Sequence, residues 1–84
     1  MNYDQINNKL TAYFNLNFGF FPATAEMASI RYLKKYLAQK NKEEITEDDL
    51  PELGRWLADK FMITGIISEA KVKKMIQDFN QKAI

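Results

Sequence analysis

The chain has 84 residues, of which 46% are hydrophobic and 27% are charged, and its formal net charge is +1. This length predicts one domain over residues 1–84, and the composition is that of a folded protein rather than a disordered one. The sequence contains neither cysteine nor histidine, which excludes disulfides, thiolate nucleophiles, zinc sites and the usual proton shuttle near neutral pH. We therefore expect a protein that is not an enzyme and holds no cofactor and no metal.

The first ten residues, MNYDQINNKL, contain no basic stretch followed by an apolar run, so no signal peptide is expected. No apolar segment approaches the roughly 20 residues needed to span a bilayer. These two observations predict a cytoplasmic protein that does not enter a membrane.

Apolar periodicity predicts a first helix over residues 3–15. Ile6, Leu10 and Phe14 recur at spacings of four, which places them on one helical face. Asn2 and the glutamine three residues later form a pattern like a capping box, in which each side chain accepts a hydrogen bond from the other's backbone N–H. Residues 16–21 are then expected to form a loop.

A second helix is predicted over residues 22–39, because Pro22 suits the first turn of a helix. Its basic side chains share one face at spacings of three and four, opposite the expected core. Residues 40–49 are polar and are interpreted as a connection. The inward stripe is expected to consist of Met27, Ile30, Leu33 and Leu37, flanked by Ala25, Ala28, Tyr32 and Tyr36.

A third helix is predicted over residues 50–63, with Asp49 as its cap. Gly54 inside it costs about 1 kcal/mol relative to alanine, and close helix packing would explain its presence. Its inward stripe is expected to consist of Leu50, Leu53, Leu57 and Phe61, with Trp56 beside them.

The segment Thr64–Ser68 is the clearest turn in the chain. Gly65 suits a left-handed helix end, Ile66 the hydrophobic contact that accompanies it, and Ser68 the cap of a fourth helix over residues 69–81. The fourth stripe is expected to consist of Val72, Met75, Ile76 and Phe79. Since no strand pattern competes, the predicted fold class is all-α, a compact bundle of about four short helices without a sheet.

Charged residues occur in blocks along the chain. The basic block contains no acid and consists of Arg31, Lys34, Lys35, Lys40 and Lys42. The acidic block follows directly and consists of Glu43, Glu44, Glu47, Asp48, Asp49 and Glu52. Acids before a helix favourably meet its positive end, and the alternative is an acidic docking surface. The basic helical face is either a solvated face or a surface for a partner.

Phe18, Phe20 and Phe21 surround a glycine within four residues. One interpretation is a lid over the end of the bundle, since a short chain rarely leaves three phenylalanines in water. The other is an exposed anchor for a partner, because aromatic side chains dominate binding hot spots.

These patterns favour a small regulatory module that binds a protein partner or itself, using Phe18, Phe20, Phe21 and the basic residues Arg31, Lys34 and Lys35. Proteins of this kind are typical of accessory factors, including those of phages and mobile elements. The alternative is a DNA-binding regulator in which residues 50–81 form a hairpin like a helix-turn-helix. The candidate nucleic-acid contacts would then be Lys71, Lys74, Gln77 and Gln81.

Overall fold

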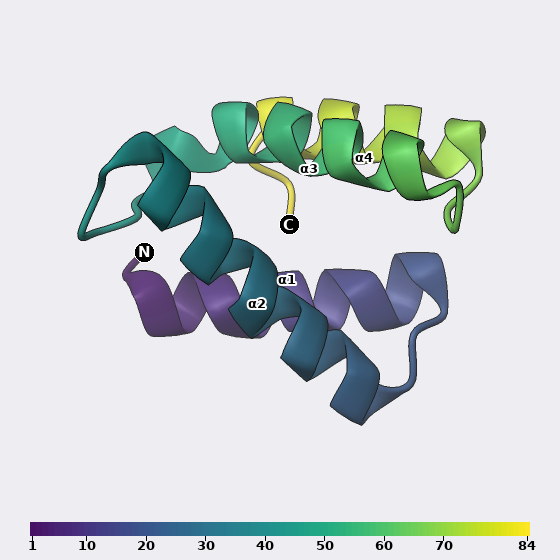
Figure 1. Cartoon of the computed structure of the whole chain (residues 1–84), viewed down its shortest axis with the longest axis horizontal. Helices are drawn as coiled ribbons and strands as arrows, with labels where there is room; N and C mark the ends of the chain where they lie inside the picture. The colour runs from purple at the N-terminus through teal and green to yellow at the C-terminus, as the bar shows by residue number, and fades with distance from the viewer. The chain divides into compact units, whose positions relative to one another are not determined.

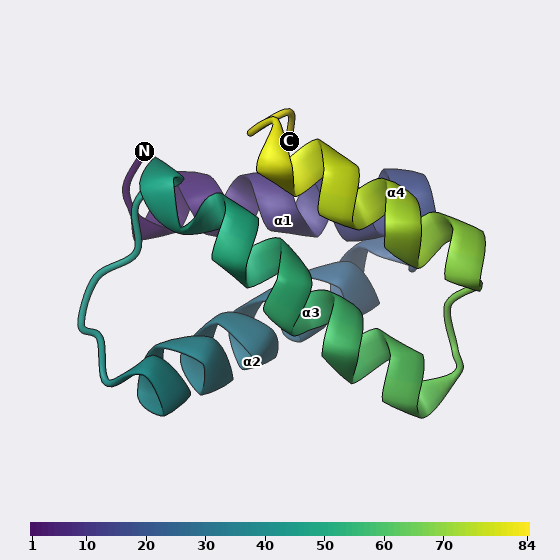
Figure 2. The same cartoon turned by 90° about the horizontal axis from the view of Figure 1, so that it is seen from above.

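The computed structural model describes residues 1–84 and contains four α-helices, one short 3-10 helix and no strand. The all-α fold class is therefore confirmed. Two units make up the chain, Met1–Glu47 and Asp48–Ile84, and each contains one antiparallel pair of helices (Figures 1 and 2). The single domain over residues 1–84 stays a prediction. The elements are α1 (Tyr3–Phe18), α2 (Pro22–Lys40), the 3-10 helix Glu47–Asp49, α3 (Leu50–Thr64) and α4 (Glu69–Asn80).

Helix α1 begins as predicted and ends three residues later than predicted. Asn2 Oδ1 accepts a hydrogen bond from the backbone N–H of Gln5 at 3.0 Å, and Gln5 Oε1 accepts one from the backbone N–H of Asn2 at 2.9 Å. The helix continues through Phe18 because the left-handed residue that ends it is Gly19, whose φ is 71°. Residues 16–18, predicted as loop, therefore form the last turn of a helix.

The buried stripe of α2 includes the predicted Leu33 but is rotated toward the flank on which Ala25 and Tyr36 were predicted. Its buried residues are Ala25, Ser29, Leu33 and Tyr36. Met27, placed in the core by its hydrophobicity, is instead 70% exposed, and Ile30 and Leu37 lie half-buried at the border of the stripe. The physical reason is the small size of the residues that face α1: the hydroxyl of Ser29 reaches Asn7 Oδ1 at 2.6 Å, which requires the two helices to approach closely.

Helix α3 buries the predicted stripe of Leu50, Leu53, Leu57 and Phe61, together with Trp56. Gly54 is buried as well, and it faces Phe79 of α4. Asp49 occupies the cap position, but its side chain makes no capping hydrogen bond. Its backbone is helical (φ −80°, ψ −12°) because the 3-10 helix runs directly into α3, whereas a capping residue needs an extended conformation.

The turn between α3 and α4 follows the prediction at two positions and departs from it at a third. Gly65 has a φ of 67°, and Ser68 caps α4 by accepting a hydrogen bond from the backbone N–H of Lys71 at 3.3 Å. Ile66, expected to make the hydrophobic contact, is 71% exposed, and Ile67 is buried in its place. Val72, Met75 and Phe79 are buried in α4. None of the four helices combines the length and apolar character that crossing a bilayer requires.

Candidate interaction surfaces

An aromatic cluster holds the C-terminal end of α1. The ring of Phe18 stacks on Phe14 at 5.7 Å between centroids and meets Tyr13 edge-on at 5.7 Å. Phe20 is half-buried, with its ring 5.8 Å from that of Phe14 and 6.0 Å from that of Phe18. Phe18, in the last turn of α1, and Phe20, just after Gly19, therefore pack against Phe14 and are not both free for a partner.

Phe21 differs from the other two phenylalanines because it projects into solvent. Its side chain is 80% exposed, while its backbone carbonyl accepts the hydrogen bond of Ala25 that starts α2. Leu16, on the last turn of α1, is 79% exposed. The connection between α1 and α2 thus presents two large apolar side chains to water.

The connection between α3 and α4 presents a larger apolar surface, which we call the hairpin tip and define as Met62, Ile63 and Ile66. Their side chains are 53%, 83% and 71% exposed. At 100° per residue Met62 and Ile63 fall outside the buried stripe of α3, and the left-handed turn at Gly65 leaves Ile66 outside as well. The sequence prediction did not identify this surface, although the helical position of Ile63, opposite the stripe, is a signal that could have found it.

The predicted basic face of α2 is exposed and has no internal counter-charge. Arg31, Lys34 and Lys35 are all exposed and make no ion pair or hydrogen bond within the chain. Met27 and Ala38 lie on the same outward face and are also exposed. The outward face of α2 is therefore positively charged, and the apolar side chain of Met27 lies at its N-terminal end.

The acidic block begins at Glu43, shortly after α2 ends at Lys40 and its left-handed cap residue Asn41. Glu43, Glu44 and Glu47 are exposed and make no ion pair or hydrogen bond within the chain. Asp48, by contrast, pairs with Lys82 at 3.1 Å. Most of the negative charge of this segment therefore faces solvent.

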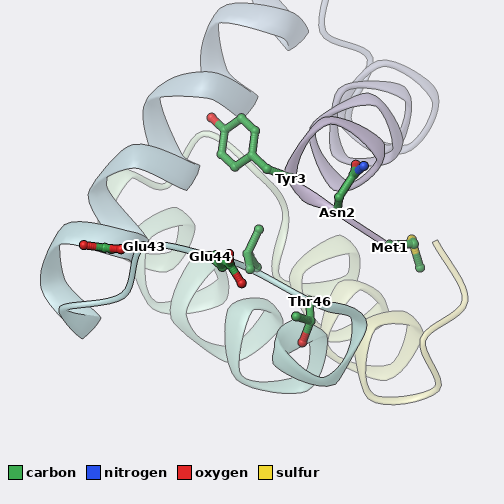
Figure 3. A pocket seen from close by; sticks show the side chains of 7 residues that line it. Met1, Asn2, Tyr3, Glu43, Glu44 and Thr46 are labelled. Atoms are coloured by element: carbon green, nitrogen blue, oxygen red, sulfur yellow. The ribbon is translucent and has the colours of Figure 1, made fainter.

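An open pocket of about 360 Å³ lies between the start of α1 and the segment after α2. Figure 3 shows that Glu43 points away from the other lining side chains, and the polar end of Asn2 belongs to the capping box of α1. The pocket holds no basic side chain and its floor includes the buried Ile45. The lining residues are Met1, Asn2, Tyr3, Glu43, Glu44, Ile45 and Thr46.

The outward face of α4 carries the residues proposed for nucleic-acid contact. Lys71, Lys74, Gln77 and Gln81 are all exposed, as the prediction requires. Two lysines of this helix are paired with acids one turn away: Lys74 lies 2.8 Å from Asp78, and Lys73 lies 3.2 Å from Glu69. These pairs reduce the positive charge that α4 offers to a phosphate backbone.

No group of three or more aspartates and glutamates is arranged to hold a metal ion. Comparison with protein-family models, with curated proteins and with solved structures found no match. The exposed surfaces of the two units are therefore the features from which a function can be inferred.

Proposed function

We propose that this protein is a non-enzymatic interaction module that binds a protein partner through the hairpin tip. The observation that carries the proposal is the exposure of Met62, Ile63 and Ile66 within five positions of the chain. Contiguous exposed apolar side chains mark interaction sites on soluble proteins, whereas single ones do not. Burying a fully exposed side chain of this size contributes roughly 1.5–3 kcal/mol, which offsets part of the cost of association.

Phe21 and Leu16 support the same function from the first hairpin. Each is about four-fifths exposed, and aromatic side chains are enriched among the residues that dominate binding energy. Of the three phenylalanines proposed from the sequence, Phe21 is the candidate anchor, because Phe18 and Phe20 pack against Phe14.

Site-specific crosslinking in the source cell tests the hairpin tip. A photoreactive phenylalanine analogue at Ile63 or Ile66 is expected to give one discrete protein adduct. The matched control carries the analogue at Lys73, which is equally helical and exposed but lies outside the tip. The adduct formed through Ile63 should be lost when Met62→Ser and Ile66→Ser are introduced together, while the melting temperature stays unchanged.

Equal labelling from Ile63 and Lys73, or no adduct from any position, would contradict the proposal. A large fall in melting temperature on substitution would show instead that the tip stabilises the fold.

The DNA-binding alternative has a separate test. Micromolar binding to duplex DNA that weakens steeply with salt and disappears in the Lys71→Glu/Lys74→Glu variant would favour it over a protein partner. We expect no such binding, because Lys74 is already paired with Asp78.

A further inference from the structure

The outward face of α2 carries positive charge that the chain itself does not neutralise. Arg31, Lys34 and Lys35 are exposed there, and none of the three makes an ion pair or hydrogen bond within the chain. Arg31 and Lys35 lie four positions apart, about one helical turn, so their like charges repel each other slightly. Carboxylates placed beside these side chains would relieve the repulsion, so the face is complementary to a partner that carries acids.

No acidic residue of α2 shares this face. At about 100° per residue, the exposed residues Met27, Arg31, Lys34 and Ala38 fall within one stripe about 60° wide, opposite the buried residues of the helix. Glu26 is the only acid of α2, and it lies about 80° outside that stripe. The positive charge of the face is therefore not offset along the helix.

The stripe also has the spacing by which one helix contacts another. Its four residues follow one another at intervals of four, three and four, as in the seam of paired helices. From Met27 to Ala38 the stripe is about 17 Å long, which corresponds to about three helical turns. Met27 is 70% exposed and offers an apolar contact at one end, and the small side chain of Ala38 permits close approach at the other.

We propose that the outward face of α2 binds an acidic amphipathic helix of a partner protein. Carboxylates spaced three and four positions apart on the partner helix pair with Arg31, Lys34 and Lys35. An apolar side chain about one turn further along the partner helix packs against Met27. The inference goes beyond the proposed function, because this face belongs to the unit Met1–Glu47 and includes no residue of the hairpin tip.

A nucleic acid fits this face less well than an acidic helix does. Three side chains can neutralise about three phosphates, whereas proteins whose affinity for DNA depends strongly on salt neutralise roughly six to ten. The exposed thioether of Met27 has no counterpart on a phosphate backbone, but it matches an apolar side chain of a protein helix. A mixture of charge and apolar contact on one stripe therefore favours a protein partner.

Fluorescence anisotropy of a labelled synthetic peptide, titrated with the full chain, tests the proposal. The probe is an alanine-rich peptide of roughly 20 residues, long enough to form a helix alone. One face of the probe carries glutamates at spacings of three and four and a leucine one turn away. A second peptide has the same composition, but its glutamates and leucine are distributed around the helix. The wild type should bind the patterned peptide more tightly than the rearranged one.

Substitutions on α2 identify the face that binds the patterned peptide. Lys34→Glu/Lys35→Glu should weaken binding about tenfold or more, because two attractions become two repulsions. Met27→Ser should weaken binding by a smaller factor, about threefold, because it removes only an apolar contact. The titrations are made at about 0.15 M ionic strength, where charges more than about 8 Å apart are largely screened.

The matched control is Lys9→Glu/Lys71→Glu, which changes the net charge by the same amount at exposed positions outside this face. It should bind the patterned peptide within about twofold of the wild type, because screening limits the effect of remote charges. The tip variant Met62→Ser/Ile66→Ser should also bind the peptide as the wild type does, so the two proposals fail or succeed separately. Circular dichroism checks that all variants keep their helices.

Three results would overturn the proposal. The first is a wild type that does not bind the patterned peptide, or binds both peptides equally. The second is an equal loss of binding in Lys34→Glu/Lys35→Glu and in the matched control. The third is tighter binding of a short DNA duplex than of the patterned peptide, abolished by Lys34→Glu/Lys35→Glu, which would assign the face to nucleic acid.

Discussion

Gly54 of α3 and Phe79 of α4 face each other so closely that a β-carbon built on Gly54 would lie 2.5 Å from Cβ of Phe79. Real non-bonded carbons do not approach to that distance, so the helices can pack as they do only because residue 54 has no side chain. Both residues are buried. A glycine that weakens α3 as an isolated helix thus allows α3 and α4 to pack together.

Gly54→Ala should therefore destabilise the protein. Alanine favours the helix by about 1 kcal/mol, but forcing an extra carbon into a packed contact typically costs about 1–3 kcal/mol. The cost should fall at the upper end, since the opposing atom is the Cβ of Phe79, which cannot rotate away from the contact. Urea unfolding of the wild type and of the Gly54→Ala variant measures the difference in unfolding free energy.

The matched control for Gly54→Ala is Asp59→Ala, at an exposed position of the same helix. This change should leave the unfolding midpoint equal or slightly raised, because it affects only helix propensity. A stabilised Gly54→Ala variant would show that α3 and α4 do not pack as described.

Phe18 and Phe21 should respond in opposite ways to truncation, although they are only three positions apart. Phe18 is 8% exposed and stacked on Phe14, so Phe18→Ala should cost about 3–5 kcal/mol, comparable with the whole stability of so short a chain. Phe21 is 80% exposed, so Phe21→Ser should change the unfolding free energy by less than about 0.5 kcal/mol. Thermal melting, monitored by circular dichroism, distinguishes the effect of Phe18→Ala from that of Phe21→Ser.

Phe18→Leu gives a measurable intermediate if Phe18→Ala does not fold, and it should lower the melting temperature by a few degrees. Phe20→Ser should fall between the two extremes because Phe20 is half-buried. Equal effects at Phe18 and Phe21 would contradict the division of this segment into a packed lid and an exposed anchor.

Ser68→Ala should destabilise α4 by about 1 kcal/mol, the usual cost of removing a capping side chain. The serine oxygen accepts a hydrogen bond from the backbone N–H of Lys71, one of the donors that no helical carbonyl can satisfy. Ser68→Asp should retain nearly all of the stability, because a carboxylate caps equally well. Urea unfolding of both variants tests the role of the cap, and equal losses would contradict it.

The sequence predicted α3 well because its hydrophobic pattern and its burial coincide. Leu53, Leu57 and Phe61 recur at helical spacing, and all three are buried. The same reasoning misplaced the centre of the buried stripe of α2, where hydrophobicity selects Met27 and the structure buries Ser29. Pattern alone does not reveal that a close helix contact prefers small residues to large apolar ones.

The candidate surfaces, like the buried faces of the helices, could be predicted from the sequence only in part. The exposure of Arg31, Lys34 and Lys35 followed from charge and spacing. The hairpin tip did not, because hydrophobicity assigns Ile66 to the interior, whereas the left-handed turn at Gly65 points it outward and Ile67 inward. In this turn, a shift of one position along the chain decides whether an isoleucine is buried or exposed.

The hydrogen bond from Ser29 to the side chain of Asn7 links α1 to α2 at a fully buried hydroxyl. Ser29→Ala should cost about 1 kcal/mol, the net value of one such bond, and Ser29→Val about 1–3 kcal/mol because it adds volume where the helices approach. A double-mutant cycle with Asn7→Ala should give a coupling energy near 1 kcal/mol. Additive effects in that cycle would show that the Asn7 side chain contributes no coupling, and that the second contact of the hydroxyl, to the backbone carbonyl of Asn7 at 3.2 Å, is sufficient for Ser29.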